Sequence, residues 1–349
     1  MTSPAQRLEG LDLARYIAFV GMVIVNFKIA MGADDSAGFA ATISGLFEGR
    51  AAATFVVLAG IGLGLAAQRS AYSATLKVTL KRALFLLIIG LLNMTIFEAD
   101  ILHYYAIYFV IAVFDSSRKT QQMIWAIISF NLVFLALVLS SDYSAGWDWT
   151  TLTYTDFWTP TGFIRNLFFN GWHPVFPWIS FFYFGMILSR QTLSEASTQN
   201  RLIGWGALAL IGAEIAAYLL MPTASAIDPE LSDLFGTSPI PLGPFYIIAG
   251  LGAASLVTGL CLRLAAPLKS IGILGLVTPA GRQTLTLYVA HILIGMGTLE
   301  ALNMLSGQTA TSALTAALIF CALVTLYAWV WRKMFKRGPL EALMRAVAG

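Results

Sequence analysis

The chain has 349 residues, of which 58% are hydrophobic and only 11% are charged, and its mean hydropathy is +0.76. These values exclude an ordinary soluble domain and indicate an integral membrane protein, while the net charge of +3 does not point to a nucleic-acid partner. Both cysteines, Cys261 and Cys321, lie in apolar runs, so neither a disulfide framework nor a metal site is expected.

Apolar windows of about 19 residues predict an all-α, polytopic bundle of about ten transmembrane helices. The expected spans are residues 11–31, 51–68, 78–96, 101–116, 122–141, 174–190, 204–221, 242–263, 283–303 and 313–331. We expect them to form a single membrane domain over residues 1–349, in a multi-pass protein of the plasma (inner) membrane.

Charged residues between the spans predict the topology. Lysine and arginine collect in alternate loops beginning with the N-terminus, so those loops and both termini are expected to be cytoplasmic. The other loops are mainly acidic and should face outward. The outer loop at 142–173 is rich in tryptophan and tyrosine, which favour the headgroup level, so we expect it to be a lid resting on the membrane.

Ionisable and amide side chains inside apolar helices are candidate site residues, because lipid penalises them. Asp12 and Arg15 lie three residues apart, a spacing that predicts a pair on one helix face, with either a structural or a site role. Asn26 either joins two helices by a hydrogen bond or orients a substrate carbonyl. Glu214 lies in the middle of its expected span, where an acid should be protonated or hydrogen bonded.

Arg50 stands at the mouth of the span at 51–68, which is packed with alanine and glycine. A charge there needs an acidic partner, and outer-side candidates are Asp34, Asp35 and Asp100. The small residues of that span should also permit close helix packing.

All three histidines are candidates for proton transfer, because their pKa lies near neutrality. His103 and His173 are expected near the outer surface, and His291 near mid-depth. Each is either a hydrogen-bonded structural residue or a general base. Tyr288 precedes His291 by three residues on the same helix face, and Arg282 either anchors the inner helix end or binds phosphate.

Several stretches in fixed order carry a family resemblance. They are RLEGLDLARYIAFVGMVIVN, GRAAATFVVLAGIGLGL, RALFLLIIGLL, DILHYYAIYFVIAVF, HPVFPWISFFYFGMILSR and GRQTLTLYVAH. Together they resemble the bacterial relatives of heparan-alpha-glucosaminide N-acetyltransferase and the neighbouring YeiB-like membrane proteins of the transmembrane acyltransferase superfamily, over nearly the whole chain.

The resemblance implies transfer of an acyl group, usually acetyl, from cytosolic acyl-CoA to an amine or hydroxyl of a carbohydrate outside. Asn26 matches an asparagine of the lysosomal relatives that is followed by a reactive loop histidine, but residues 27–102 contain no histidine. We therefore expect direct transfer, with His291, His103 or His173 as general base and Asn26 on the thioester carbonyl. Arg282, Arg15 and Tyr288 are the candidates for binding acyl-CoA.

Two other functions stay open. A small-molecule transporter would also need a polar path through the bundle, although no inverted repeat supports one. A noncatalytic envelope-biogenesis subunit would explain the missing loop histidine. Stabilisation by coenzyme A favours the enzyme, and flux without a donor favours the transporter. Besides the bilayer and a carbohydrate-like acceptor, a second copy of the chain is an expected partner.

Overall fold

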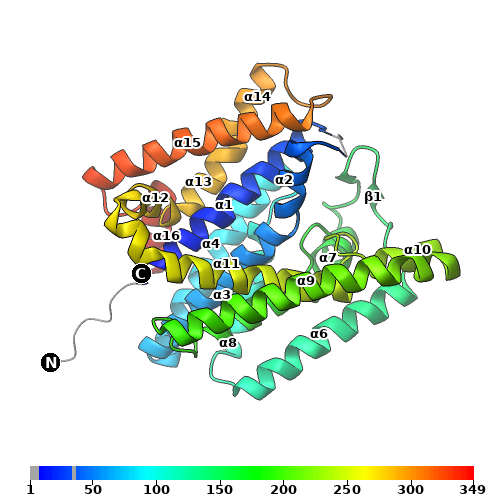
Figure 1. Ribbon diagram of the computed structural model, residues 1–349, viewed down its shortest axis with the longest axis horizontal. Helices are drawn as coiled ribbons and strands as arrows, with labels where there is room; N and C mark the ends of the chain where they lie inside the picture. Colours follow the sequence, from blue (N-terminus) through cyan, green and yellow to red (C-terminus); the bar gives the residue numbers. More distant parts are fainter. Residues whose placement is uncertain (1–7, 34–36) are drawn as a thin grey trace. The chain divides into compact units, whose positions relative to one another are not determined.

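The computed structural model describes residues 8–33 and 37–349, most of which are helical (Figure 1). Each expected span coincides with a helix or a run of helices. These elements are α1 (Glu9–Ala30), α3 (Arg50–Arg69), α4 (Tyr72–Met94), α5 (Leu102–Phe114), α6 (Thr120–Ser140), α8 (Val175–Leu188), α9 (Ala196–Ile227), α11 (Pro244–Ser270), the run from α13 to α14, and α15 (Ala310–Met334). The helix positions predicted from hydropathy are thus confirmed.

Seven helices among the described residues are long and apolar enough to cross a membrane, by length and composition. Two further apolar helices, α5 and α8, are shorter. The chain is therefore an all-α, multi-pass membrane protein. Ten spans and two cytoplasmic termini stay predictions.

The last but one expected span is not a continuous α-helix. It consists of α13 (Thr284–Ala290), a π-helical segment η2 (His291–Met296) and α14 (Gly297–Ala301). π-Segments inside α-helices are rare and occur frequently at functional sites. This one begins at His291.

Short helices that hydropathy did not predict connect the long helices or follow the last of them. They are α2 (Phe39–Phe47), α10 (Pro229–Leu234), α12 (Ile273–Gly281) and α16 (Pro339–Ala348). The loop at 142–173 is also structured: it holds β1 (Trp147–Asp148) paired antiparallel with β2 (Thr153–Tyr154), then α7 (Pro160–Arg165) and the π-helical η1 (Asn166–Asn170). Thr159 is the N-cap of α7, because its hydroxyl oxygen accepts a hydrogen bond from the Gly162 N–H. Pro160 then occupies the first helical position, which suits proline.

The chain divides into two compact units, each described here by itself. Unit 1 comprises Met1–Phe55, Thr192–Leu210 and Gly252–Leu343, and unit 2 comprises Val56–Gln191, Ile211–Leu251 and Met344–Gly349. In unit 1, α1 packs on α12 and α15 (Figure 1), where Ala14, Ala280 and Ala317 are fully buried. Small side chains let these helices approach closely without a hydrophobic driving force.

In unit 2, α4 packs on α5 and α6 packs on α8. The small residues of α3 have the expected effect: a Cβ on Gly60 would lie 2.0 Å from the Phe182 carbonyl oxygen in α8. Alanine at this position would therefore force the two backbones apart. The side chains of Tyr104 and Tyr108 in α5 and of Trp178 in α8 are fully buried in this unit.

Candidate functional site

A buried pair joins Asn26 of α1 to His291 of η2 in unit 1. The Asn26 side-chain nitrogen lies 2.9 Å from His291 Nε2, and the other ring nitrogen, Nδ1, contacts the carbonyl oxygen of Tyr288. Since a carbonyl only accepts, Nδ1 carries the hydrogen, and Nε2 accepts from the Asn26 amide. Both ring nitrogens of His291 are thus engaged, and a base at Nε2 would have to displace Asn26.

The predicted pair of Asp12 and Arg15 is part of a larger ionic cluster in unit 1. Asp12, which is 1% exposed, accepts from Arg15 at 2.8 Å and from Arg282 Nε at 2.9 Å. Glu9 lies 2.7 Å from Lys269 and 3.8 Å from Arg282. The residues expected to bind phosphate are therefore held by carboxylates. Arg15 and Arg282 stay candidates for donor binding, with part of their hydrogen-bonding capacity already used.

Arg50 donates from its guanidinium to the Glu48 carbonyl oxygen at 2.9 Å. Two of its expected partners, Asp34 and Asp35, lie outside the described residues. The third pairing, with Asp100, stays a prediction. Thr54, one turn along α3, donates to the Arg50 carbonyl oxygen.

Glu214 is hydrogen bonded, as expected for an acid in an apolar helix. Its carboxyl group accepts from the Thr237 hydroxyl at 2.9 Å within unit 2. Its side chain is partly exposed. Nothing in this arrangement assigns Glu214 a chemical role.

Asp100 and His103 form a buried dyad at the start of α5 in unit 2. His103 Nδ1 lies 3.2 Å from Asp100 Oδ2, and both side chains are 0% exposed, while the depth of His103 near the outer side of the membrane stays a prediction. Asp100 also accepts from Asn93 at 3.0 Å and from the Leu102 backbone N–H at 2.7 Å. A carboxylate suits this position because the helix N-terminus presents unpaired N–H groups to it.

The dyad fixes the ring of His103. A carboxylate beside Nδ1 favours the tautomer with hydrogen on that nitrogen, so Nε2 carries the lone pair. His103 Nε2 is buried and has no hydrogen-bond partner within the described part of the chain. The arrangement of carboxylate, imidazole and available Nε2 is that of an oriented general base.

His173 lies near this dyad, in the loop that precedes α8. The Tyr104 ring is 3.8 Å from the His103 ring and 6.0 Å from the His173 ring, between centroids. Burial and, to a smaller extent, the nearby His103 together lower the pKa of His173 to about 3. His173 is therefore neutral at physiological pH. The structure brings these two predicted histidines together.

Sequence reasoning missed Tyr104 and Asn166. The Tyr104 hydroxyl donates to Asn166 Oδ1 at 2.5 Å, and a Cβ on Gly171 would lie 2.1 Å from the same hydroxyl oxygen. Because glycine has no Cβ, the backbone at Gly171 can lie directly against the Tyr104 hydroxyl. The available signal was the stretch NLFFNGWHP, in which two asparagines and a histidine bracket aromatic residues of the outer loop.

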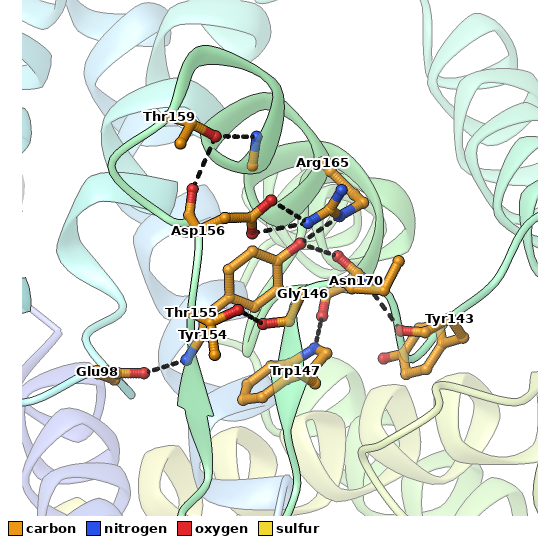
Figure 2. A network of polar contacts seen from close by, with 12 residues as sticks. Glu98, Tyr143, Gly146, Trp147, Tyr154, Thr155, Asp156, Thr159, Arg165 and Asn170 are labelled. Carbon is orange, nitrogen blue, oxygen red and sulfur yellow. Dashed lines mark hydrogen bonds and ion pairs between the residues drawn. The ribbon is translucent and has the colours of Figure 1, made fainter.

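The loop at 142–173 near this region is held in place by side-chain hydrogen bonds and an ion pair (Figure 2). The Tyr154 hydroxyl accepts from Arg165 at 2.8 Å and donates to Asn170 at 2.7 Å, while Arg165 contacts both Asp156 oxygens at 2.7 Å. Trp147 donates its indole N–H to the Asn170 carbonyl oxygen at 2.6 Å. These hydrogen bonds fix the conformation of the loop. Its contact with the membrane stays a prediction.

No group of three or more His, Cys, Asp or Glu side chains that could hold a metal ion occurs among the described residues.

Two family models match the chain. The catalytic-domain model of heparan-alpha-glucosaminide N-acetyltransferase matches residues 7–221, and a family described as a protein of unknown function (DUF418) matches residues 187–349. No curated protein and no solved structure matches it.

Proposed function

Because the chain belongs to the heparan-alpha-glucosaminide N-acetyltransferase family, we propose that it is an acyl-CoA-dependent membrane acyltransferase of the plasma (inner) membrane. It transfers an acyl group, in the first place acetyl, from cytosolic acyl-CoA to a carbohydrate-like acceptor on the outer side. The matched catalytic-domain model supports the reaction class. The basic inner loops and the acidic, aromatic outer loops support the polarity of the transfer.

The observation that carries the proposal is the Asp100–His103 dyad with its unpartnered Nε2. In the proposed step, His103 Nε2 takes the proton of the acceptor's nucleophilic group as that group attacks the thioester carbonyl carbon. The new bond to the acyl carbon forms, the carbon–sulfur bond breaks, and the coenzyme A thiolate leaves. The thiolate then takes the proton from the His103 imidazolium, which restores the neutral base.

His291 is the other candidate base, and its geometry supports that role less well. Its Nε2 already accepts from the Asn26 amide, whereas the same atom of His103 has no partner. In this proposal His291 positions Asn26 in unit 1 rather than removing a proton. Arg15, Arg282 and Tyr288 remain candidates for binding the donor.

Purified protein in liposomes with labelled acetyl-CoA tests the assignment. We expect His103→Ala to lower turnover by about 10²- to 10⁴-fold, the usual contribution of a general base, and added imidazole to restore part of it. His291→Ala is the matched control, and its folded fraction should keep turnover within about tenfold. The reverse pattern, with His103→Ala active and His291→Ala inactive, would contradict the assignment.

A further inference from the structure

Buried polar atoms without a hydrogen-bond partner are concentrated in one region of unit 2. Within the described part of the chain they include His103 Nε2, Asn166 Nδ2, Trp172 Nε1, His173 Nδ1 and Trp178 Nε1. Each unsatisfied buried group destabilises a protein, and native structures contain few of them. A concentration of such atoms therefore indicates a place where a polar group from another molecule binds.

These atoms belong to one cluster around Tyr104. Its ring lies against the His103 ring, and its hydroxyl holds the Asn166 oxygen at 2.5 Å, which leaves the amide nitrogen as the unpartnered end. Trp178 contacts the His173 ring at 4.7 Å between centroids, and Trp172 precedes His173 in the chain. The side chains of His103, Asn166 and Trp178 are at most 1% exposed.

The chemistry of the unpartnered atoms specifies their ligand. Asn166 Nδ2, Trp172 Nε1 and Trp178 Nε1 can only donate. His103 Nε2 can only accept, because Nδ1 carries the hydrogen toward Asp100. The complementary group has lone pairs for several N–H donors and one hydrogen for the imidazole. A carbohydrate satisfies both conditions, because one hydroxyl group gives its hydrogen to the imidazole and accepts from two N–H donors, and a neighbouring hydroxyl group accepts from the third.

A protonated amine does not fit the same cluster. An ammonium group has three donors and no lone pair, so the three N–H groups would stay unsatisfied. The nearby carboxylate, Asp100, already accepts from Asn93, the Leu102 N–H and His103. The environment that keeps His173 neutral would also penalise an ammonium ion.

We propose that His103, Asn166, Trp172 and Trp178 bind the acceptor and that its nucleophile is an uncharged hydroxyl group, so that the product is an ester rather than an amide. This inference rests on the proposed function. It goes beyond it by choosing between the amine and hydroxyl acceptors that the reaction class allows.

The product tests the choice of nucleophile. Protein in liposomes is given labelled acetyl-CoA with either methyl glucoside, which has only hydroxyl groups, or glucosamine. We expect labelled methyl glucoside whose acetyl group is released by hydroxylamine, as an ester is. With glucosamine, any product should also be an ester. Transfer to the glucosamine nitrogen alone, giving a hydroxylamine-resistant amide, would overturn the proposal.

Two tryptophan variants test the binding residues. Trp172→Phe removes an indole N–H without a partner, whereas Trp147→Phe removes one that donates to Asn170 within the chain. We expect Trp172→Phe to raise the KM for methyl glucoside about tenfold, the effect of one hydrogen bond, without lowering the Tm. Trp147→Phe should instead lower the Tm and change KM little. Equal KM values for Trp172→Phe and wild type would overturn the assignment.

A binding measurement separates this inference from the proposed function. Methyl glucoside should raise the Tm of wild-type protein without acyl-CoA, and raise it less in Trp172→Phe. If that shift occurs while no acceptor is acylated, the proposed function fails and the hydroxyl site stands. If acetyl-CoA is consumed but methyl glucoside neither binds nor reacts, the hydroxyl site fails alone.

Discussion

The amide of Asn26 donates to Nε2 of His291 over 2.9 Å, although 265 residues of chain separate them. Asn26 is 9% exposed and His291 is 0% exposed. The second ring nitrogen faces the Tyr288 carbonyl oxygen, which fixes the tautomer and the ring plane. The bond therefore ties α1 to the first residue of the π-helical segment η2.

Removing either member of this pair should destabilise unit 1. We expect Asn26→Ala and His291→Ala each to lower the free energy of unfolding by about 1–3 kcal/mol, because each removes the hydrogen bond between two buried side chains. The double variant should lose less than the sum of the two. Reversible unfolding in detergent micelles measures the coupling, and strictly additive losses would mean that the two side chains do not depend on each other.

Replacing Asp100 should lower the turnover number strongly and the stability of the fold only slightly. In Asp100→Asn, an amide oxygen can still accept the Leu102 backbone N–H, but the charge that orients His103 is lost. Loss of an orienting carboxylate lowers turnover by up to about 10⁴-fold. We expect such a loss at a Tm near that of wild type. Asn93→Ala, which removes a neutral donor to the same carboxylate, is the milder control.

Glu98 should make the outer loop more stable in acid. Burial raises its pKa above the ordinary value of 4.5, and the 2.6 Å hydrogen bond from the Tyr154 backbone N–H opposes this only in part (Figure 2). Because the pKa is higher in the folded state, Glu98 contributes stability below pH 4.5 that is lost as the pH rises through the folded-state pKa.

The test is the Tm difference between wild type and Glu98→Gln as a function of pH. Glutamine keeps an acceptor for the Tyr154 N–H and does not titrate. We expect the wild-type Tm to fall relative to that of the variant between about pH 4.5 and neutrality. A difference that stays constant with pH would show that Glu98 has the same pKa folded and unfolded.

The ionic cluster of Glu9, Asp12, Arg15, Lys269 and Arg282 should depend on Asp12 far more than on Glu9. Asp12 is 1% exposed and neutralises two arginines, so Asp12→Asn should destabilise the protein by about 3 kcal/mol. Glu9 is 30% exposed and its partner Lys269 is 64% exposed, so Glu9→Gln should change stability by less than about 1 kcal/mol. Chemical denaturation of both variants checks the contrast.

The same two variants test the expected donor site. If Arg282 and Arg15 bind coenzyme A phosphate, Asp12→Asn should also change the KM for acetyl-CoA, since it removes the group that holds both guanidinium groups. Glu9→Gln should leave that KM within about twofold. An unchanged KM in both variants would place donor binding elsewhere.

The hydropathy and local spacing of the sequence were enough to predict the helices of this protein. They also identified the polar side chains that lie within its apolar segments. A helix in lipid satisfies its own backbone hydrogen bonds, so its position depends on neighbouring residues in sequence. The same locality explains why the Asp12–Arg15 pair, one helical turn apart, could be predicted. Residues Asn26 and His291 were each recognisable as polar groups in apolar helices.

Only the tertiary structure decided what those groups contact. The pairing of Asn26 with His291, the bond from Arg282 to Asp12, and the burial of His103 depend on packing between distant segments. The contact between the Tyr104 hydroxyl and the Asn166 side-chain oxygen likewise joins residues 62 positions apart in the sequence. The reason is physical: hydropathy is a sum over consecutive residues, whereas a hydrogen bond between helices needs atoms placed within a few tenths of an ångström by the whole packed unit.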